Sequence, residues 1–243
     1  MNAKTRTTSA TMTKKTDNIK TQKITRKKVR LFFYGGAKKD VDNITFLNAA
    51  QNVKKDYEND KRNDIEIKPF YEIADAEFII SKIELQEDNS IESIDFFSHG
   101  SELALYVKRV FILGLNQSLY VNEEIEQEHK NILGEYSGNL SEINYSKFTN
   151  TAIIEIHGCN TGSVEEKNKN INFSMIFSKH LHDAGKTKSV VIGHVTKANP
   201  NQHKTLTGSD YRHGGRRVYH NGKELFFTRI EGRITSAMIN QKL

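Results

Sequence analysis

The sequence predicts a three-layer α/β fold, with helices on both faces of a mostly parallel sheet and an antiparallel hairpin near the carboxy terminus. Three observations predict it. Short apolar runs alternate with segments of helical apolar spacing, and most of the apolar runs end at glycine or polar turn residues. Near the end of the chain, Asn221-Gly222 separates two β-rich segments, a pattern typical of a two-residue hairpin turn. Such alternation implies right-handed crossovers and binding loops at the carboxyl edge of the parallel strands.

The amino-terminal half of the predicted domain alternates strand and helix. Each strand is expected where an apolar or alternating run is bounded by turn residues, and each helix where apolar side chains recur every three or four positions. The third strand leads directly to Ser98-His99-Gly100. The elements expected here are strands at 29–34, 65–70 and 91–97, and helices at 40–57 and 74–85.

The carboxy-terminal half continues the pattern after an interruption. Residues 103–115 are β-rich and favour an excursion or hairpin, whereas residues 116–148 are polar and give no clear element. A fourth apolar run then leads into Gly158-Cys159. The remaining elements are expected as strands at 151–157 and 189–195, a helix at 171–184 that ends at Gly185, and a hairpin over 218–228.

The charge of the chain is unevenly distributed. Residues 1–28 contain nine Lys or Arg and one acid, so the net charge of this segment is +8. Because the formal net charge of the whole chain is +6, residues 29–243 carry a net charge of −2. Few large apolar side chains occur there, so we expect a disordered basic tail at 1–27 and one domain at 28–243. No aromatic residue lies among the basic ones, which does not favour nucleic-acid binding.

Targeting signals are also not evident in the sequence. No run of eighteen apolar residues and no apolar stretch near the amino terminus occur, so we expect no membrane span and no secretory signal. The expected location is therefore cytoplasmic, and export as an effector is left open.

Two residues at matching places suggest the chemistry. Cys159 is the only cysteine of the chain, and both it and His99 follow an apolar strand at a glycine-containing turn. If the third and fourth strands are neighbours, a thiol and an imidazole meet at one edge of the sheet, which is the minimum for a cysteine nucleophile. The backbone amides of Gly100 and Cys159 could then bind a developing oxyanion.

At these residues the sequence resembles the caspase-like cysteine peptidases. The likeness lies in SIDFFSHG at 93–100 and AIIEIHGC at 152–159, and the Cys-Asn-Thr-Gly run at 159–162 is most similar to bacterial CHAT-type domains. The resemblance implies a caspase-like fold, His99 as catalytic imidazole, Cys159 as nucleophile, and Gly100 and Cys159 as oxyanion donors. His157 falls where the caspase pattern has a glutamine that lines the primary specificity pocket, so a preference for Asp is not implied.

Further residues are weaker candidates. A loop after the fifth strand carries Asp210, Arg216 and Arg217, which could line a substrate pocket and select for a basic or an acidic residue. Alternatively, this segment is a solvated loop before the hairpin that contacts no substrate. The pair His180 and His182 points to different helix faces, which is poor zinc geometry, so no metal or other cofactor is expected.

The sequence thus predicts a cysteine endopeptidase with a Cys159/His99 dyad, acting on a peptide or protein. Two alternatives remain: a binding module that keeps the fold without turnover, and a bacterial toxin or effector domain that processes itself. A regulatory protein partner could dock on the excursion at 101–150.

Overall fold

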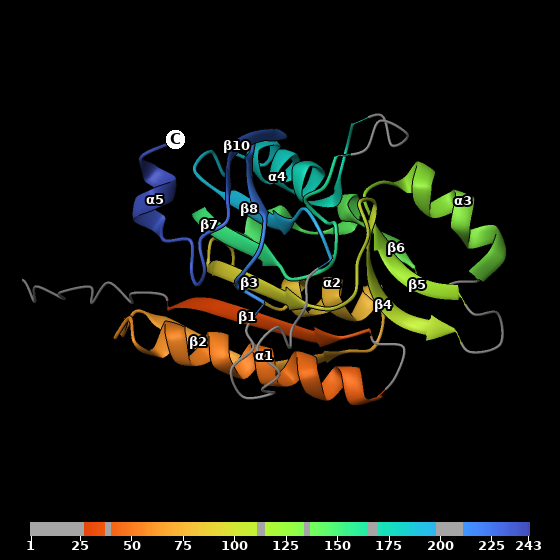
Figure 1. Cartoon of the computed structure of the whole chain (residues 1–243), viewed down its shortest axis with the longest axis horizontal. Coiled ribbons are helices and arrows are strands. Elements are labelled where there is room, and N and C mark those ends of the chain that lie inside the picture. Colours follow the sequence, from red (N-terminus) through yellow and green to blue (C-terminus); the bar gives the residue numbers. More distant parts are fainter. Residues whose placement is uncertain (1–26, 37–39, 111–114, 134–136, 165–169, 198–210) are drawn as a thin grey trace, which may run out of the picture.

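The computed structural model describes residues 27–36, 40–110, 115–133, 137–164, 170–197 and 211–243. Among these residues, seven strands form a main sheet in the order β10-β9-β8-β7-β3-β1-β2 (Figure 1). The pairs from β2 to β8 are parallel, and β9 and β10 add two antiparallel strands at the edge. The strands are β1 (Lys28–Gly35), β2 (Ile65–Ile73), β3 (Ile91–Phe97), β7 (Phe148–Ile156), β8 (Val190–His194), β9 (Arg216–His220) and β10 (Lys223–Thr228).

A small second sheet follows β3. It has the order β4-β5-β6, with β4 and β5 antiparallel and β5 and β6 parallel. Together with helix α3 it lies at one end of the molecule, opposite the carboxy-terminal helix α5 (Figure 1). The bounds are β4 (Ala104–Val110), β5 (Leu115–Tyr120), β6 (Gly138–Asn139), α3 (Glu123–Leu133) and α5 (Ser236–Asn240), and two short 3₁₀ turns follow at η1 (Leu140–Glu142) and η2 (Tyr145–Lys147).

The two faces of the main sheet are covered by different helices. Because successive side chains of a strand point to opposite faces, Leu31 and Phe33 pack on one face with the buried residues of α2 (Ala76–Glu84) and α4 (Phe173–Asp183). On the other face, Phe32 and Phe97 pack against buried residues of α1 (Asp40–Glu58). The carboxy-terminal residues also lie on this second face, where Ile234 and Ile239 pack on Val190 and Ile192 of β8.

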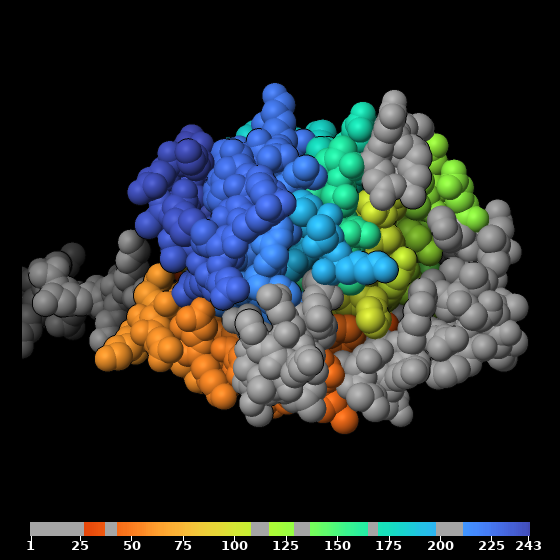
Figure 2. Space-filling model, in the orientation of Figure 1, coloured from red at the N-terminus to blue at the C-terminus, as the bar shows by residue number. Residues whose placement is uncertain are grey.

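The carboxy-terminal part of the chain contacts the early part at the surface. Figure 2 shows the blue carboxy-terminal atoms against the orange region of α1 and β2. An ion pair crosses this boundary, since Arg233 Nη1 lies 2.7 Å from Asp60 Oδ1. Segments that are far apart in the sequence therefore lie side by side at this surface.

Most elements expected from the sequence are present. The five parallel strands and the helices α1, α2 and α4 lie within a few residues of the expected ranges, and an antiparallel pair flanks Asn221-Gly222. The elements β5, α3, β6 and α5 were not expected, since β5, α3 and β6 lie almost entirely in the polar range 116–148. No helix within the described ranges is both long enough and apolar enough to cross a lipid bilayer.

Candidate active site

The two predicted reactive residues follow neighbouring strands. β3 and β7 pair in parallel, and over their last rungs each β3 residue stands opposite the β7 residue sixty positions later, up to Phe96 with Ile156. Continued by three residues, this register sets His99 level with Cys159. The expectation that the third and fourth strands are neighbours is confirmed.

The turns after β3 and β7 pack directly on each other. A Cβ added at Gly100 would lie 2.7 Å from Thr161 Cγ2 and 3.4 Å from the Cys159 carbonyl oxygen. A Cβ added at Gly158 would lie 3.1 Å from the same methyl group and 3.4 Å from Gly100 Cα. Glycine at both positions makes room for the methyl group of Thr161.

The backbone of His99 is held by β4. The amide of Tyr106 donates to the His99 carbonyl at 2.9 Å, and the amide of Ser101 donates to the Ala104 carbonyl at 2.9 Å. Gly100 and Leu105 form the antiparallel bridge between these bonds, so they are a non-hydrogen-bonded pair. In such a pair the N–H points away from the partner strand, and the Gly100 amide therefore does not donate to β4.

The imidazole of His99 lies against α1. Its ring centroid is 5.2 Å from that of Phe46, with the two rings nearly perpendicular. His99 is half-buried, as is Cys159. Both candidate side chains thus stand in a partly shielded place that solvent still reaches.

The turn that carries Cys159 is tied to β8. Asn160 has a φ of 59°, in the left-handed region where asparagine is tolerated, and its amide donates to the Thr196 carbonyl at 3.2 Å. Two residues further, the Gly162 amide donates to the His194 carbonyl at 2.7 Å. The nucleophile candidate therefore sits in a defined turn, fixed by backbone bonds on its carboxyl side.

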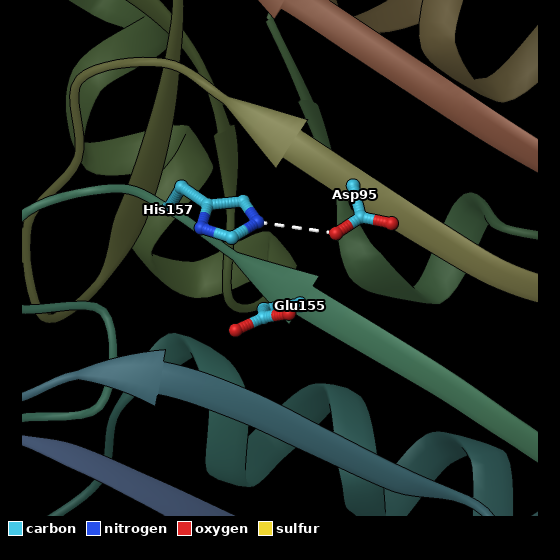
Figure 3. Close-up of side chains that lie close together, drawn as sticks. All are labelled: Asp95, Glu155 and His157. Atoms are coloured by element: carbon cyan, nitrogen blue, oxygen red, sulfur yellow. Dashed lines mark hydrogen bonds and ion pairs between the residues drawn. The ribbon is translucent and has the colours of Figure 1, made fainter. Parts of the chain in front are cut away.

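A layer of buried charge lies on β3 and β7, with Asp95, Glu155 and His157 close together (Figure 3). Asp95 and Glu155 stand opposite each other on β3 and β7, four positions before His99 and Cys159. His157 completes the cluster, with Nε2 3.1 Å from Asp95 Oδ1 (Figure 3). All three are buried.

Arginines balance this charge. Arg212 Nε donates to Glu155 Oε2 at 3.1 Å, its Nη1 donates to Asp56 Oδ2 at 2.6 Å, and its Nη2 lies 3.6 Å from Asp95 Oδ1. Arg216 Nη1 donates to the other Glu155 oxygen at 2.9 Å. Asp95, Glu155 and His157 place ligand atoms within 4.8 Å of one another, as a metal site would. Two guanidinium groups already supply the compensating positive charge, so the arrangement does not call for a metal.

Burial and the neighbouring charges strongly shift the pKa values of Glu155 and His194. Burial raises the pKa of Glu155, but Arg212, His157 and Arg216 more than offset this and lower it to about 2. Burial, with a smaller contribution from His157, lowers the pKa of His194 to about 3. Glu155 is therefore ionised and His194 neutral at physiological pH.

The weaker pocket candidates fall in different places. His157 is fully buried and stacks on Phe97, with ring centroids 4.3 Å apart. Arg216 is also fully buried, and besides Glu155 its Nη2 donates to two backbone carbonyls, so it is not an exposed cation for a substrate. Arg217 is half-buried and its Nη1 donates to the carbonyl of Gly162, three residues after Cys159. Asp210 lies outside the described residues.

Sequence reasoning missed most of the charged layer. Asp95 and Glu155 had a visible signal, since each is an acid inside an otherwise apolar strand. Their partner Arg212 was visible only as one of several polar residues in a loop. Tyr57 had no such signal, although its hydroxyl donates to Asp95 Oδ2 at 3.0 Å.

A cavity of about 390 Å³ lies away from the dyad. Its floor includes Ser93 and Ile153, a rung of β3 and β7 that is six residues before His99 and Cys159. The cavity therefore lies on the same two strands as the two candidate residues, on their amino-terminal side.

Comparison with known proteins gives no further assignment. No protein-family model matches the chain, and the search of curated proteins finds no match. The interpretation of the site therefore depends on its geometry and chemistry.

Proposed function

We propose that this chain is a cysteine endopeptidase with a three-layer caspase-like fold closed by a carboxy-terminal hairpin. The observation that carries the proposal is the register of β3 and β7, which sets His99 level with Cys159 at the carboxyl edge. Ligands of open parallel sheets bind at that edge, next to the point where strand order reverses. Here the order reverses between β1 and β3, and β3 leads to His99.

The reaction follows from a thiol beside an imidazole. His99 accepts the thiol proton, and the sulfur of Cys159 attacks the carbonyl carbon of a peptide bond. The oxyanion that forms is stabilised by the amides of Gly100 and Cys159. The C–N bond then breaks as the imidazolium gives its proton to the leaving amine, which leaves a thioester.

Water completes the cycle. His99 takes a proton from the attacking water, the C–S bond breaks, and the acid product leaves as the thiol regains a proton. No step in this sequence requires oxidation or reduction. The bond from the Tyr106 amide positions the backbone of His99, and the ring of Phe46 contacts its imidazole.

A binding module is the second candidate, and one observation favours it. Tyr211 is buried and packs near Phe46, Phe97 and His157, in the space between α1 and the sheet below the dyad. A side chain in this space limits how deep a substrate pocket can be. A protein of this shape could hold a peptide at the sheet edge without cleaving it.

The test separates the two candidates. The full chain is incubated with fluorogenic peptides that differ only in the residue before the cleaved bond, and in parallel is followed for fragments of itself. We expect cleavage by the wild-type chain and a loss of about 10⁴-fold or more in Cys159→Ala and in His99→Ala. His182→Ala, a change of a half-buried histidine on α4, is the matched control and should retain activity.

The outcomes are distinct. Cleavage that persists in Cys159→Ala comes from another protease and contradicts the proposal. If no peptide is cleaved but a peptide binds with saturable affinity to wild type and to Cys159→Ala, the binding module is supported. Labelling of Cys159 with iodoacetamide adds a second readout, because a thiol activated by His99 reacts at neutral pH and should react more slowly in His99→Ala.

A further inference from the structure

The cavity beside Ser93 of β3 and Ile153 of β7 has the size of a ligand site. At about 390 Å³ it falls within the range of small-molecule pockets. Its walls come from β1, β3, β7, the end of α1 and the carboxy-terminal segment 233–237. Figure 2 shows the carboxy-terminal and early segments meeting on this side of the molecule.

Guanidinium groups dominate the polar wall of the cavity. Arg30, Arg62 and Arg233 line it, and Arg30 and Arg233 both lie on the ring of Tyr57, at 3.8 and 4.5 Å from its centroid. A neighbouring hollow of about 220 Å³ shares Arg30, Tyr57 and Arg62 with it and adds Lys61. Stacking on an aromatic ring holds a guanidinium group in one plane, which suits it to bind an anion through two parallel hydrogen bonds.

The acids of the cavity are already matched by cations. Asp60 accepts from Arg30 Nη2 at 3.2 Å and from Arg233 Nη1 at 2.7 Å, so one carboxylate serves two arginines. Of the other lining acids, Glu92 accepts from Lys28, and Glu155 accepts from Arg212 and Arg216. Each guanidinium group has five N–H donors, so Arg30 and Arg233 keep donors that Asp60 does not use.

An unpaired hydroxyl lies on the floor. Ser93 is 2% exposed and lines the cavity, and within the described part of the chain its Oγ has no hydrogen-bond partner. A buried hydroxyl without a partner costs free energy that a bound polar group recovers. The apolar part of the lining comes from the side chains of Ile153, Ile234 and Ala237.

We infer that this cavity binds a small organic anion, a carboxylate or a phosphate ester. Arg30 and Arg233 hold the anionic group, and Ser93 Oγ hydrogen-bonds a polar atom of the ligand. Ile153 and Ile234 contact its carbon skeleton. The site is separate from His99 and Cys159, and the inference does not depend on peptidase activity.

Calorimetric titration of the full chain tests the inference with two probes, inorganic phosphate and citrate, and with glycerol as an uncharged comparison. We expect saturable binding of at least one anion, one per chain, and none of glycerol. Arg233→Gln should weaken the binding about tenfold or more, as expected when a charged hydrogen bond is lost. Arg229→Gln removes an exposed arginine outside the cavity lining and should leave the binding unchanged.

Further arms separate the alternatives. Ser93→Ala removes the unpaired hydroxyl of the floor and repeats the test where Arg233→Gln affects folding, which circular dichroism would reveal. Preference for phosphate or for citrate assigns the anionic group of the ligand. Cys159→Ala should bind as wild type does, so this result stands apart from the peptidase test. Absence of saturable binding of both anions, or equal weakening in Arg233→Gln and Arg229→Gln, overturns the inference.

Discussion

The two faces of the main sheet are both buried, but one is apolar and the other carries charged side chains. The face toward α2 and α4 is apolar along β3 and β7, with Ile94, Phe96, Ile154 and Ile156 all fully buried. The face toward α1 carries charge at the rung between them, where Asp95 and Glu155 are also buried. Parallel strands buried on both sides are usually apolar on both, so the charged face departs from the common pattern.

The charged face carries a cost in stability that the apolar face does not. Burying an ion costs several kcal/mol unless its partners and hydrogen bonds compensate. The charged layer lies between the dyad candidates and the cavity, and its residues reach both ends: His157 is two residues before Cys159, and Glu155 lines the cavity. We therefore expect single changes on the charged face to lower stability most and to depend on pH, and single changes on the apolar face to lower it less and not to depend on pH.

The largest effect should come from removing Arg212. Arg212→Met keeps much of the volume but leaves Glu155 with one cation and Asp95 without its nearby guanidinium. Breaking a buried ion pair in this way should lower the free energy of unfolding by about 3–5 kcal/mol, measured by urea denaturation.

The matched control for that change is Arg217→Met on β9. The Arg217 side chain is 29% exposed and pairs with Glu224, so the loss should be about 1 kcal/mol or less. Equal losses in the two variants would mean that the buried layer contributes no more than a surface pair.

The second effect is a dependence on pH that the charged face should produce through His194. The pKa of His194 is lowered from 6.5 to about 3, so below pH 6.5 the unfolded chain binds a proton that the folded chain does not. The stability is therefore complete above pH 6.5 and falls as the pH decreases, by at most about 1.4 kcal/mol per pH unit for this group. The lowered pKa of Glu155 adds to the loss at lower pH, below about 4.5.

Thermal unfolding from about pH 7 to about pH 5 measures this effect. His194→Gln removes the titrating ring, and its stability should fall less steeply over that range than the wild-type stability does. An identical slope in the two proteins would show that His194 is not the group that titrates.

Sequence reasoning found the apolar face and the edge of the sheet but not the charged layer. The runs that end at Ser98 and His157 identify buried strands, and two like strands in a row imply a parallel pair with their ends together. The layer depends on contacts that no local pattern records. Arg212 meets Asp56 across 156 residues, and α1 brings Asp56 there only because Phe46 and Val53 pack on the sheet.

The excursion after β3 was found only in part for a related reason. Residues 103–115 gave a β pattern, but the partner strand runs to Tyr120 through polar positions. Helix α3 has an acidic first turn, with Glu123 and Glu124, that resembles a polar loop in sequence. Tertiary packing against β5 and β6, rather than apolar periodicity, defines these elements.

The smallest effect should be on the apolar face and should not depend on pH. Ile154→Val removes one methylene from a fully buried side chain between α4 and the sheet, and should lower the free energy of unfolding by about 0.5–1.5 kcal/mol. Because no titrating group gains or loses a partner, the difference from wild type should be the same at about pH 7 and about pH 5. Urea denaturation at both values checks this. A difference that grows at the lower pH would mean that the two faces are coupled, and that packing on the apolar side holds the buried charges in register.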